Sequence, residues 1–291
     1  SVSQINFEDY FLDKQMRFDY IIAGSSNSQT IFFEQIKEEP FWGGTKTNLI
    51  DKFDLGDYRF LIYDLQTDTL IYSRGYSDLF LEWQDIPEAD SIKRAYYSSI
   101  VFPFPKNDVR LEIKKRNKHM EWFTIYNYTI DVNSYLINSS NPPDYKTHKV
   151  HYSGDPSKKV DIVIIPEGYT KSELKKFEKD CERFVESFFS YSPFQENMDK
   201  FNFWIVDSPS EESGTDNPGK NEWKNTILNT HFYTFDSERY LTTRDVKSIR
   251  DIAGCVPYDQ IYILVNTKKY GGGGIYNFYN LCSSDHPLSE S

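Results

Sequence analysis

Seven segments in the first half of the chain are rich in β-branched and aromatic residues and are separated by polar turn residues. They cover residues 18–24, 29–36, 58–65, 69–76, 95–104, 109–115 and 121–131. Two neighbouring pairs predict hairpins, with turns at Gln66–Asp68 and near Asn117. Short strands at this spacing predict an antiparallel β-sandwich.

The second half has a different pattern. Residues 160–165 form an apolar run of the kind that is buried on both faces of a sheet, and Pro166 is expected to end it. From 174 to 188 apolar residues recur every three or four positions, which predicts a helix. Residues 200–207 alternate as a second strand, so we expect a parallel strand–helix–strand unit with a right-handed crossover.

Helix starts are predicted at two places. Thr170 and Glu173 have the spacing of a capping box in front of the helix at 174–188. Thr242 or Thr243 is expected to cap a further helix, which ends at Gly254.

The last stretch of the chain contains a run of four glycines. Asp259–Asn266 alternates as a half-buried strand, and the glycines of Tyr270–Gly274 follow it as an expected hinge. Ile275–Leu281 then resumes a β pattern. Its polar-tipped residues indicate an edge strand with an open hydrogen-bonding side, which is able to accept a peptide.

Turn and loop residues concentrate at Asn138–Asp144 and mark the expected linker. We therefore predict two domains, residues 1–144 and residues 145–291. The fold class is α+β, with an N-terminal antiparallel β-sandwich followed by an α/β domain that has a mixed sheet.

Composition and charge exclude some classes of function. The chain of 291 residues is 38% hydrophobic and 17% aromatic, as expected of a folded protein, and its net charge of −11 argues against a nucleic-acid partner. No apolar run is long enough to span a membrane. The three cysteines leave the compartment open, and Cys181 is expected on the buried face of a helix. The oligomeric state is not indicated.

Three sequence segments resemble one known family. GGGGIYNFYNLCSSDHPLSES resembles the segment that precedes the zinc-binding helix of the M64 zinc metallopeptidases, the family of the IgA peptidases. VDIVIIPEGYTKSELKKFEKDCERF and PSEESGTDNPG are similar to the opening strand and helix and to the long loop of that family. Residues before about 145 resemble its N-terminal β domain.

The resemblance implies a zinc-dependent peptidase with a zincin-like catalytic domain, secreted or located in the cell envelope. In such enzymes an HExxH helix holds zinc and supplies a general base. No HExxH occurs in the 291 residues, so no catalytic residue and no metal ligand is assigned here. The zinc ligands are expected beyond Ser291, and the catalytic domain is expected to be truncated and inactive without them.

The predicted site therefore lies on the substrate side. Gly272, Gly273, Gly274, Ile275 and Tyr276 are predicted to bind a polypeptide as an added strand, because glycines allow another backbone to approach closely. The resemblance supports this, since metzincin-like peptidases have such a strand at the upper rim of the cleft. Proline at position 275 of the complete enzyme is then expected to impair cleavage more than folding.

Other chemistries fit the same residues less well. A phosphate-binding glycine loop is followed by a helix, whereas a strand is predicted after these glycines. Ser283–His286 contains the residue types of a Ser-His-Asp triad, but these residues are adjacent in sequence, and a catalytic triad is assembled from distant positions. His231 has no second histidine at ligand spacing and is expected to be packed or hydrogen-bonded, whereas His119 and His286 are expected to be solvated loop residues. The carboxylates of the loop 208–223 either form an irregular calcium site or, as we favour, bond within the loop.

Two alternative functions remain. One is a non-enzymatic surface module that binds carbohydrate or protein through exposed aromatic residues of the N-terminal half. The other is a degenerate pseudo-peptidase. Reading the coding sequence beyond Ser291 distinguishes them from the peptidase, because only the peptidase requires an HExxH there.

Overall fold

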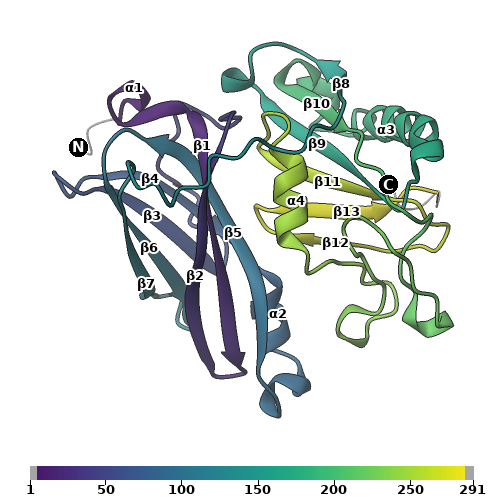
Figure 1. The fold of residues 1–291 in the computed structure, drawn as a ribbon, viewed down its shortest axis with the longest axis horizontal. Coiled ribbons are helices and arrows are strands. Elements are labelled where there is room, and N and C mark those ends of the chain that lie inside the picture. Colours follow the sequence, from purple (N-terminus) through teal and green to yellow (C-terminus); the bar gives the residue numbers. More distant parts are fainter. Residues whose placement is uncertain (1–4, 286–291) are drawn as a thin grey trace. The chain divides into compact units, whose positions relative to one another are not determined.

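The computed structural model describes residues 5–285. The chain divides into two compact units, Ser1–Asn141 and Pro142–Ser291, and each is described by itself. The first unit contains two antiparallel sheets and the second contains one mixed sheet flanked by helices (Figure 1). The α+β fold class predicted from the sequence is confirmed.

In the first unit all seven predicted strands are present. One sheet has the order β2-β1-β5 and the other the order β4-β3-β6-β7. The strands are β1 Phe11–Ser25, β2 Ser28–Glu39, β3 Tyr58–Asp64, β4 Leu70–Tyr76, β5 Arg94–Pro105, β6 Val109–Arg116 and β7 Trp122–Ile130. Both predicted hairpins form, since β3 pairs with β4 and β6 pairs with β7.

Side chains from the two sheets meet in a common core. The rings of Phe60 on β3 and Phe102 on β5 lie 6.1 Å apart between centroids. The hydroxyls of Tyr20 on β1 and Tyr76 on β4 are 2.8 Å apart and hydrogen-bonded. Apolar side chains that alternate with polar ones along each strand thus face one another, as the sequence pattern predicts.

The sequence pattern did not indicate the short helices of the first unit. They are α1 Phe7–Tyr10, α2 Leu79–Gln84 and the 3₁₀ turn Pro87–Asp90. Asp78 caps α2 by accepting a hydrogen bond from the Leu81 N–H at 3.0 Å. A helix of six residues is too short to show a clear 3.6-residue period.

The sheet of the second unit has six strands in the order β12-β13-β11-β9-β10-β8. The four central strands are parallel, and β12 and β8 run antiparallel at the two edges. The bounds are β8 Thr147–Tyr152, β9 Val160–Glu167, β10 Phe201–Val206, β11 Gln260–Val265, β12 Gly272–Ile275 and β13 Tyr279–Ser283. The half-exposed β8 was not predicted.

Strand β9 extends further than expected. We predicted that Pro166 ends it, but β9 continues to Glu167. Pairing with β10 stops at Ile164, whereas pairing with β11 continues to Glu167. Proline is tolerated here because one side of the strand no longer needs a hydrogen-bond donor.

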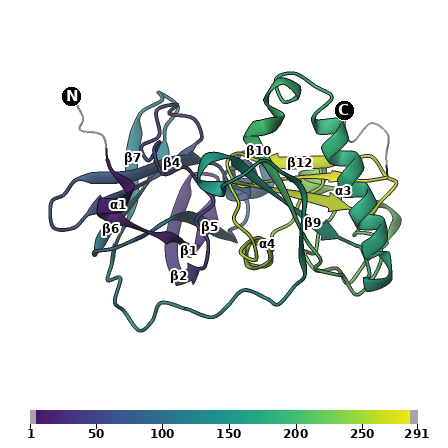
Figure 2. The ribbon, with the colours of Figure 1, turned by 90° about the horizontal axis from the view of Figure 1, so that it is seen from above.

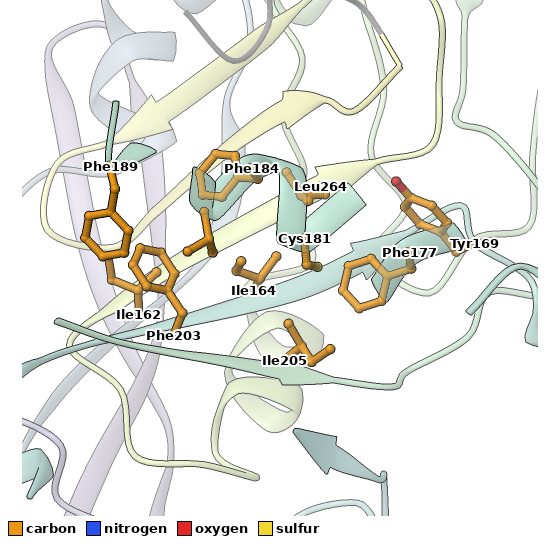
Figure 3. Close-up of a cluster of buried hydrophobic side chains, with 11 residues drawn as sticks. Ile162, Ile164, Tyr169, Phe177, Cys181, Phe184, Phe189, Phe203, Ile205 and Leu264 are labelled. Atoms are coloured by element: carbon orange, nitrogen blue, oxygen red, sulfur yellow. The ribbon is translucent and has the colours of Figure 1, made fainter. Parts of the chain in front are cut away.

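Helix α3 (Leu174–Phe188) lies against one face of this sheet, in contact with β8, β10 and β11 (Figure 2). Figure 3 shows its Phe177, Cys181 and Phe184 among side chains of β9, β10 and β11. Cys181 is fully buried, as predicted. The predicted capping box is also present, because Thr170 and Glu173 bond to each other's backbone in the 3₁₀ turn Lys171–Glu173.

Helix α4 (Val246–Ala253) contacts β9 and ends at the predicted Gly254. Its cap differs from the prediction, because Asp245, and neither Thr242 nor Thr243, accepts the Ser248 N–H. Both threonines are buried in hydrogen bonds to neighbouring segments instead. The remaining 3₁₀ turns are Pro156–Lys158, Gln195–Lys200, Pro218–Lys220 and Thr234–Asp236.

Candidate functional site

Three of the four glycines in the run belong to a strand. The sequence was interpreted as a hinge followed by one strand over 275–281, but Gly272–Ile275 forms β12 and Tyr279–Ser283 forms β13, joined by a turn. β12 is the edge strand, and β13 lies inside the sheet between β12 and β11. Glycine lacks a side chain that would show a strand pattern, which explains the error.

Backbone groups of β12 face two directions in alternation. The Gly272 N–H donates to the Arg239 C=O and the Gly272 C=O accepts from the Leu241 N–H, both at 3.2 Å, on the outer side of the strand. Gly274 therefore also points outward, whereas Gly273 and Ile275 point toward β13. No outer partner of Gly274 is present among residues 5–285, and this glycine is exposed.

The five predicted site residues lie together, but they differ in what they offer to a peptide. Gly274 and Tyr276 are exposed, and Tyr276 begins the turn after the strand. Ile275 is buried, with 3% of its surface exposed. The outer groups of Gly272 are occupied by the chain itself. A peptide strand added to this edge would first meet the N–H and C=O of Gly274. Their part in peptide binding stays a prediction.

Close packing against the chain itself explains two of the glycines. A Cβ atom at Gly271 would lie 2.4 Å from the Phe232 ring, and one at Gly273 would lie 2.5 Å from the Leu241 carbonyl oxygen. No real Cβ approaches a backbone oxygen so closely. At Gly274 a Cβ would instead meet the Oδ1 of Asn280 at 2.4 Å, which is the end of a movable side chain.

Residues 239–241, which we call the strap, occupy the outer side of β12 at Gly272. The segment that follows the strap is paired with residues near position 230. The His231 N–H donates to the Thr242 C=O at 2.9 Å, and the hydroxyls of Thr234 and Thr242 bond at 2.6 Å. His231 is thus part of a hydrogen-bonded segment, as the sequence favoured.

Glu167, at the end of β9, is the buried centre of this region, and no sequence pattern singles it out as a site residue. Its side chain is 0% exposed. Oε1 accepts hydrogen bonds from the Thr226 hydroxyl at 2.6 Å and from the Thr230 N–H and hydroxyl at 2.9 Å. Oε2 accepts the Leu228 N–H at 2.9 Å. Burial raises the pKa of Glu167, and these donors oppose that shift.

A second polar network lies at the carboxyl ends of β9, β11 and β13. The Lys176 ammonium donates to Asp180, Asn266 and Asp285 at 2.9 to 3.0 Å. The buried Tyr169 hydroxyl bonds to Asp180 at 2.7 Å and to Ser284 at 2.6 Å, and burial raises the pKa of Tyr169. These contacts hold the end of β13 against α3.

The serines at the end of β13 have structural partners. The Ser283 hydroxyl donates to the Gly271 C=O at 2.9 Å, and the Ser284 hydroxyl donates to the Val265 C=O at 3.1 Å. Neither is placed as a nucleophile. His286 lies outside the described residues. His119 is exposed at the tip of its hairpin.

The described residues do not provide a zinc site. In residues 5–285, no three His, Cys, Asp or Glu side chains gather in a way that could hold a metal ion. Two carboxylates of the loop 208–223 bond to the backbone just after it, because Asp216 accepts the Lys224 N–H at 2.6 Å and Glu212 accepts the Asn225 N–H at 2.7 Å. These carboxylates bond locally, as the sequence favours, but their backbone partners lie one and two residues past the predicted end of the loop.

Comparisons with known proteins match both halves of the chain to one family. Residues 6–127 match the family model described as Peptidase M64 N-terminus, and residues 149–290 match the one described as IgA Peptidase M64. A search of the curated proteins finds no match. Across the described part of the chain, no helix has the length and apolar character needed to cross a membrane.

Proposed function

Since the chain belongs to the M64 peptidase family, we propose that the protein hydrolyses peptide bonds with zinc and that β12 binds the polypeptide substrate. Zinc would polarise the scissile carbonyl and activate water. Among the described residues no group of three His, Cys, Asp or Glu side chains could hold a metal ion, and we assign these residues no catalytic step. Their part is to position the substrate.

One observation carries the substrate-binding part of the proposal. β12 is an antiparallel edge strand, and the N–H and C=O of Gly274 point outward without an outer partner in the described part of the chain. An extended peptide gains main-chain hydrogen bonds by pairing with such an edge. The exposed Tyr276 lies next to it and would contact the side chains of the peptide.

We also propose that the protein acts outside the cytoplasm, secreted or in the cell envelope. The family likeness supports this location. None of the three cysteines forms a disulfide, so disulfide bonding does not indicate the compartment.

The catalytic part is tested with a longer polypeptide that includes an HExxH segment. We expect it to contain zinc, to cleave a denatured protein and to lose this activity when the zinc is chelated. Residues 1–291 alone are expected to show no cleavage. Cleavage by residues 1–291 would contradict the proposal, and a longer chain that binds proteins without hydrolysing them would favour the binding module or the pseudo-peptidase.

The substrate-binding part is tested at Gly274. Replacing Gly274 by proline removes the outward N–H, so we expect peptide cleavage by the longer chain to fall at least about tenfold, the effect of one lost hydrogen bond to a bound ligand. Gly274→Ala is the matched control, because it adds the same Cβ against Asn280 and keeps the N–H. Equal activity of the two variants would exclude strand pairing at this position.

The structure also changes the test that the sequence suggested at Ile275. Its backbone faces β13 and its side chain is buried. Proline there would break a hydrogen bond inside the sheet. Ile275→Pro is therefore a test of folding, and Gly274→Pro is the test of substrate binding.

A further inference from the structure

We propose that the strap, residues 239–241, is an end wall of the peptide site, and that Glu167 is the positioning residue that holds it there. The inference rests on the proposed function of β12. It goes further, because it states where along β12 a bound peptide must stop pairing.

The strap uses the same backbone groups that a peptide would need. Tyr240 pairs with Gly272 as a parallel bridge, so both outward groups of Gly272 are bonded to Arg239 and Leu241. A peptide strand paired with Gly274 would need the outward groups of Gly272 next, because these alternate every second residue. Pairing therefore ends at Gly272, whichever way the peptide runs.

The Tyr240 side chain strengthens this boundary. An added Cβ at Gly273 would lie 2.8 Å from the Tyr240 ring and 2.5 Å from the Leu241 carbonyl oxygen. The strap thus lies over one face of β12 as well as along its edge. Toward the other end of β12, by contrast, Gly274 and the following Tyr276 are exposed.

Glu167 holds the strap through two steps of hydrogen bonds. Its carboxylate binds the segment 226–230 through four donors. That segment binds the residues just after the strap, because the Leu228 C=O accepts the Thr243 hydroxyl and the neighbouring His231 pairs with Thr242. A single buried carboxylate at the end of β9 therefore sets the position of the strap beside Gly272.

Amide hydrogen exchange on residues 1–291 tests the anchor. In the unaltered protein we expect the Gly272 and Leu241 amides to exchange slowly and the Gly274 amide to exchange fast. Glu167→Gln places an amide NH₂ among the donors of the segment 226–230, so this segment and the strap that it holds are expected to be released. The Gly272 amide then loses its partner on the strap and is expected to exchange about tenfold or more faster. The Ile263 amide in the central strand β11 must stay protected, which shows that the sheet remains folded.

Two further variants test whether the effect on the Gly272 amide depends on the hydrogen bonds to Glu167. Thr226→Val removes one of the four donors to Glu167 and is expected to have a smaller effect on Gly272. Asp161→Asn is the matched control, because Asp161 is also a buried carboxylate of β9, at the opposite end from Glu167, and its bonds from Asn202 and Trp204 go to one oxygen that asparagine keeps. It should leave Gly272 unchanged.

An eight-residue peptide of alternating Thr and Gln, blocked at both ends, tests the wall itself. Saturating peptide is expected to slow exchange at Gly274 in the unaltered protein and to leave Gly272 as it was. In Glu167→Gln, where the strap is released, the peptide should slow both amides about tenfold or more, because pairing then extends across Gly272. A merely structural role of Glu167 does not produce this second protection.

The outcomes separate the two proposals. If the peptide does not slow exchange at Gly274 in any variant, the proposal that β12 pairs with a peptide is wrong, and so is the end-wall proposal that depends on it. If the peptide protects Gly274 but Gly272 exchanges fast without it in the unaltered protein, only the end wall is overturned. The same holds if the peptide fails to protect the freed Gly272 of Glu167→Gln.

Discussion

Replacing Arg17 by methionine is expected to lower the free energy of unfolding of the N-terminal unit by about 3–5 kcal/mol. Arg17 lies on β1, the strand between β2 and β5, and its side chain is fully buried. It donates to Asp19 and to Glu39, each at 3.0 Å, and both carboxylates are buried as well. Methionine fills similar space but leaves these two charges without their guanidinium, and uncompensated charge in a protein interior is costly.

The measurement is urea denaturation followed through the amide signals of β1. Lys14→Met is the matched control, because Lys14 on the same strand forms an ion pair with Glu38 at 2.7 Å that remains exposed. Exposed pairs contribute at most about 1 kcal/mol. If Arg17→Met lowers the free energy of unfolding no more than Lys14→Met does, the buried ion pairs of Arg17 do not stabilise the unit.

Replacing Phe177 by alanine is expected to destabilise the second unit by about 3–5 kcal/mol, the usual effect of removing a buried ring. Phe177 is 0% exposed, and its ring lies 5.2 Å from that of Tyr169 (Figure 3). The cavity would lie between α3 and the sheet. Because Tyr169 also bonds to Ser284, we expect the end of β13 to lose order in the same variant.

Urea denaturation of the second unit measures the loss of stability. Amide exchange of Ser284 reports on the end of β13, because the Ser284 N–H donates to the Val265 C=O. Lys175→Ala on the exposed side of α3 is the control, with an expected change within about 0.5 kcal/mol. If Phe177→Ala lowers the free energy of unfolding only slightly, α3 is held against the sheet mainly by its other contacts.

Local patterns allowed most of the strands to be predicted. The seven strands of the first unit and the strands β9, β10 and β11 follow alternating or continuous apolar residues, because the two-residue period of a strand exposes each side chain to a fixed face. The strand–helix–strand unit was predicted for the same reason. Elements with a weak period, such as α2 and β8, were missed.

The candidate site shows where this reasoning stops. The glycine run carries no periodicity, so the identity of its last three residues as an edge strand depends on β13 beside them and on the strap outside them. The role of Glu167 was likewise hidden. Its donors lie about 60 positions later in the chain, and no local rule indicates that Thr226 and Thr230 come to meet it.

By itself the sequence determined the fold class, most strands and the family likeness, because these depend on residue periods and on short motifs. Only the tertiary structure decided which backbone groups of the glycine strand face outward and which the chain already occupies. Hydrogen bonds between segments far apart in the sequence settle that question. Such contacts arise only once the sheet brings Glu167, the strap and Gly272 into one region.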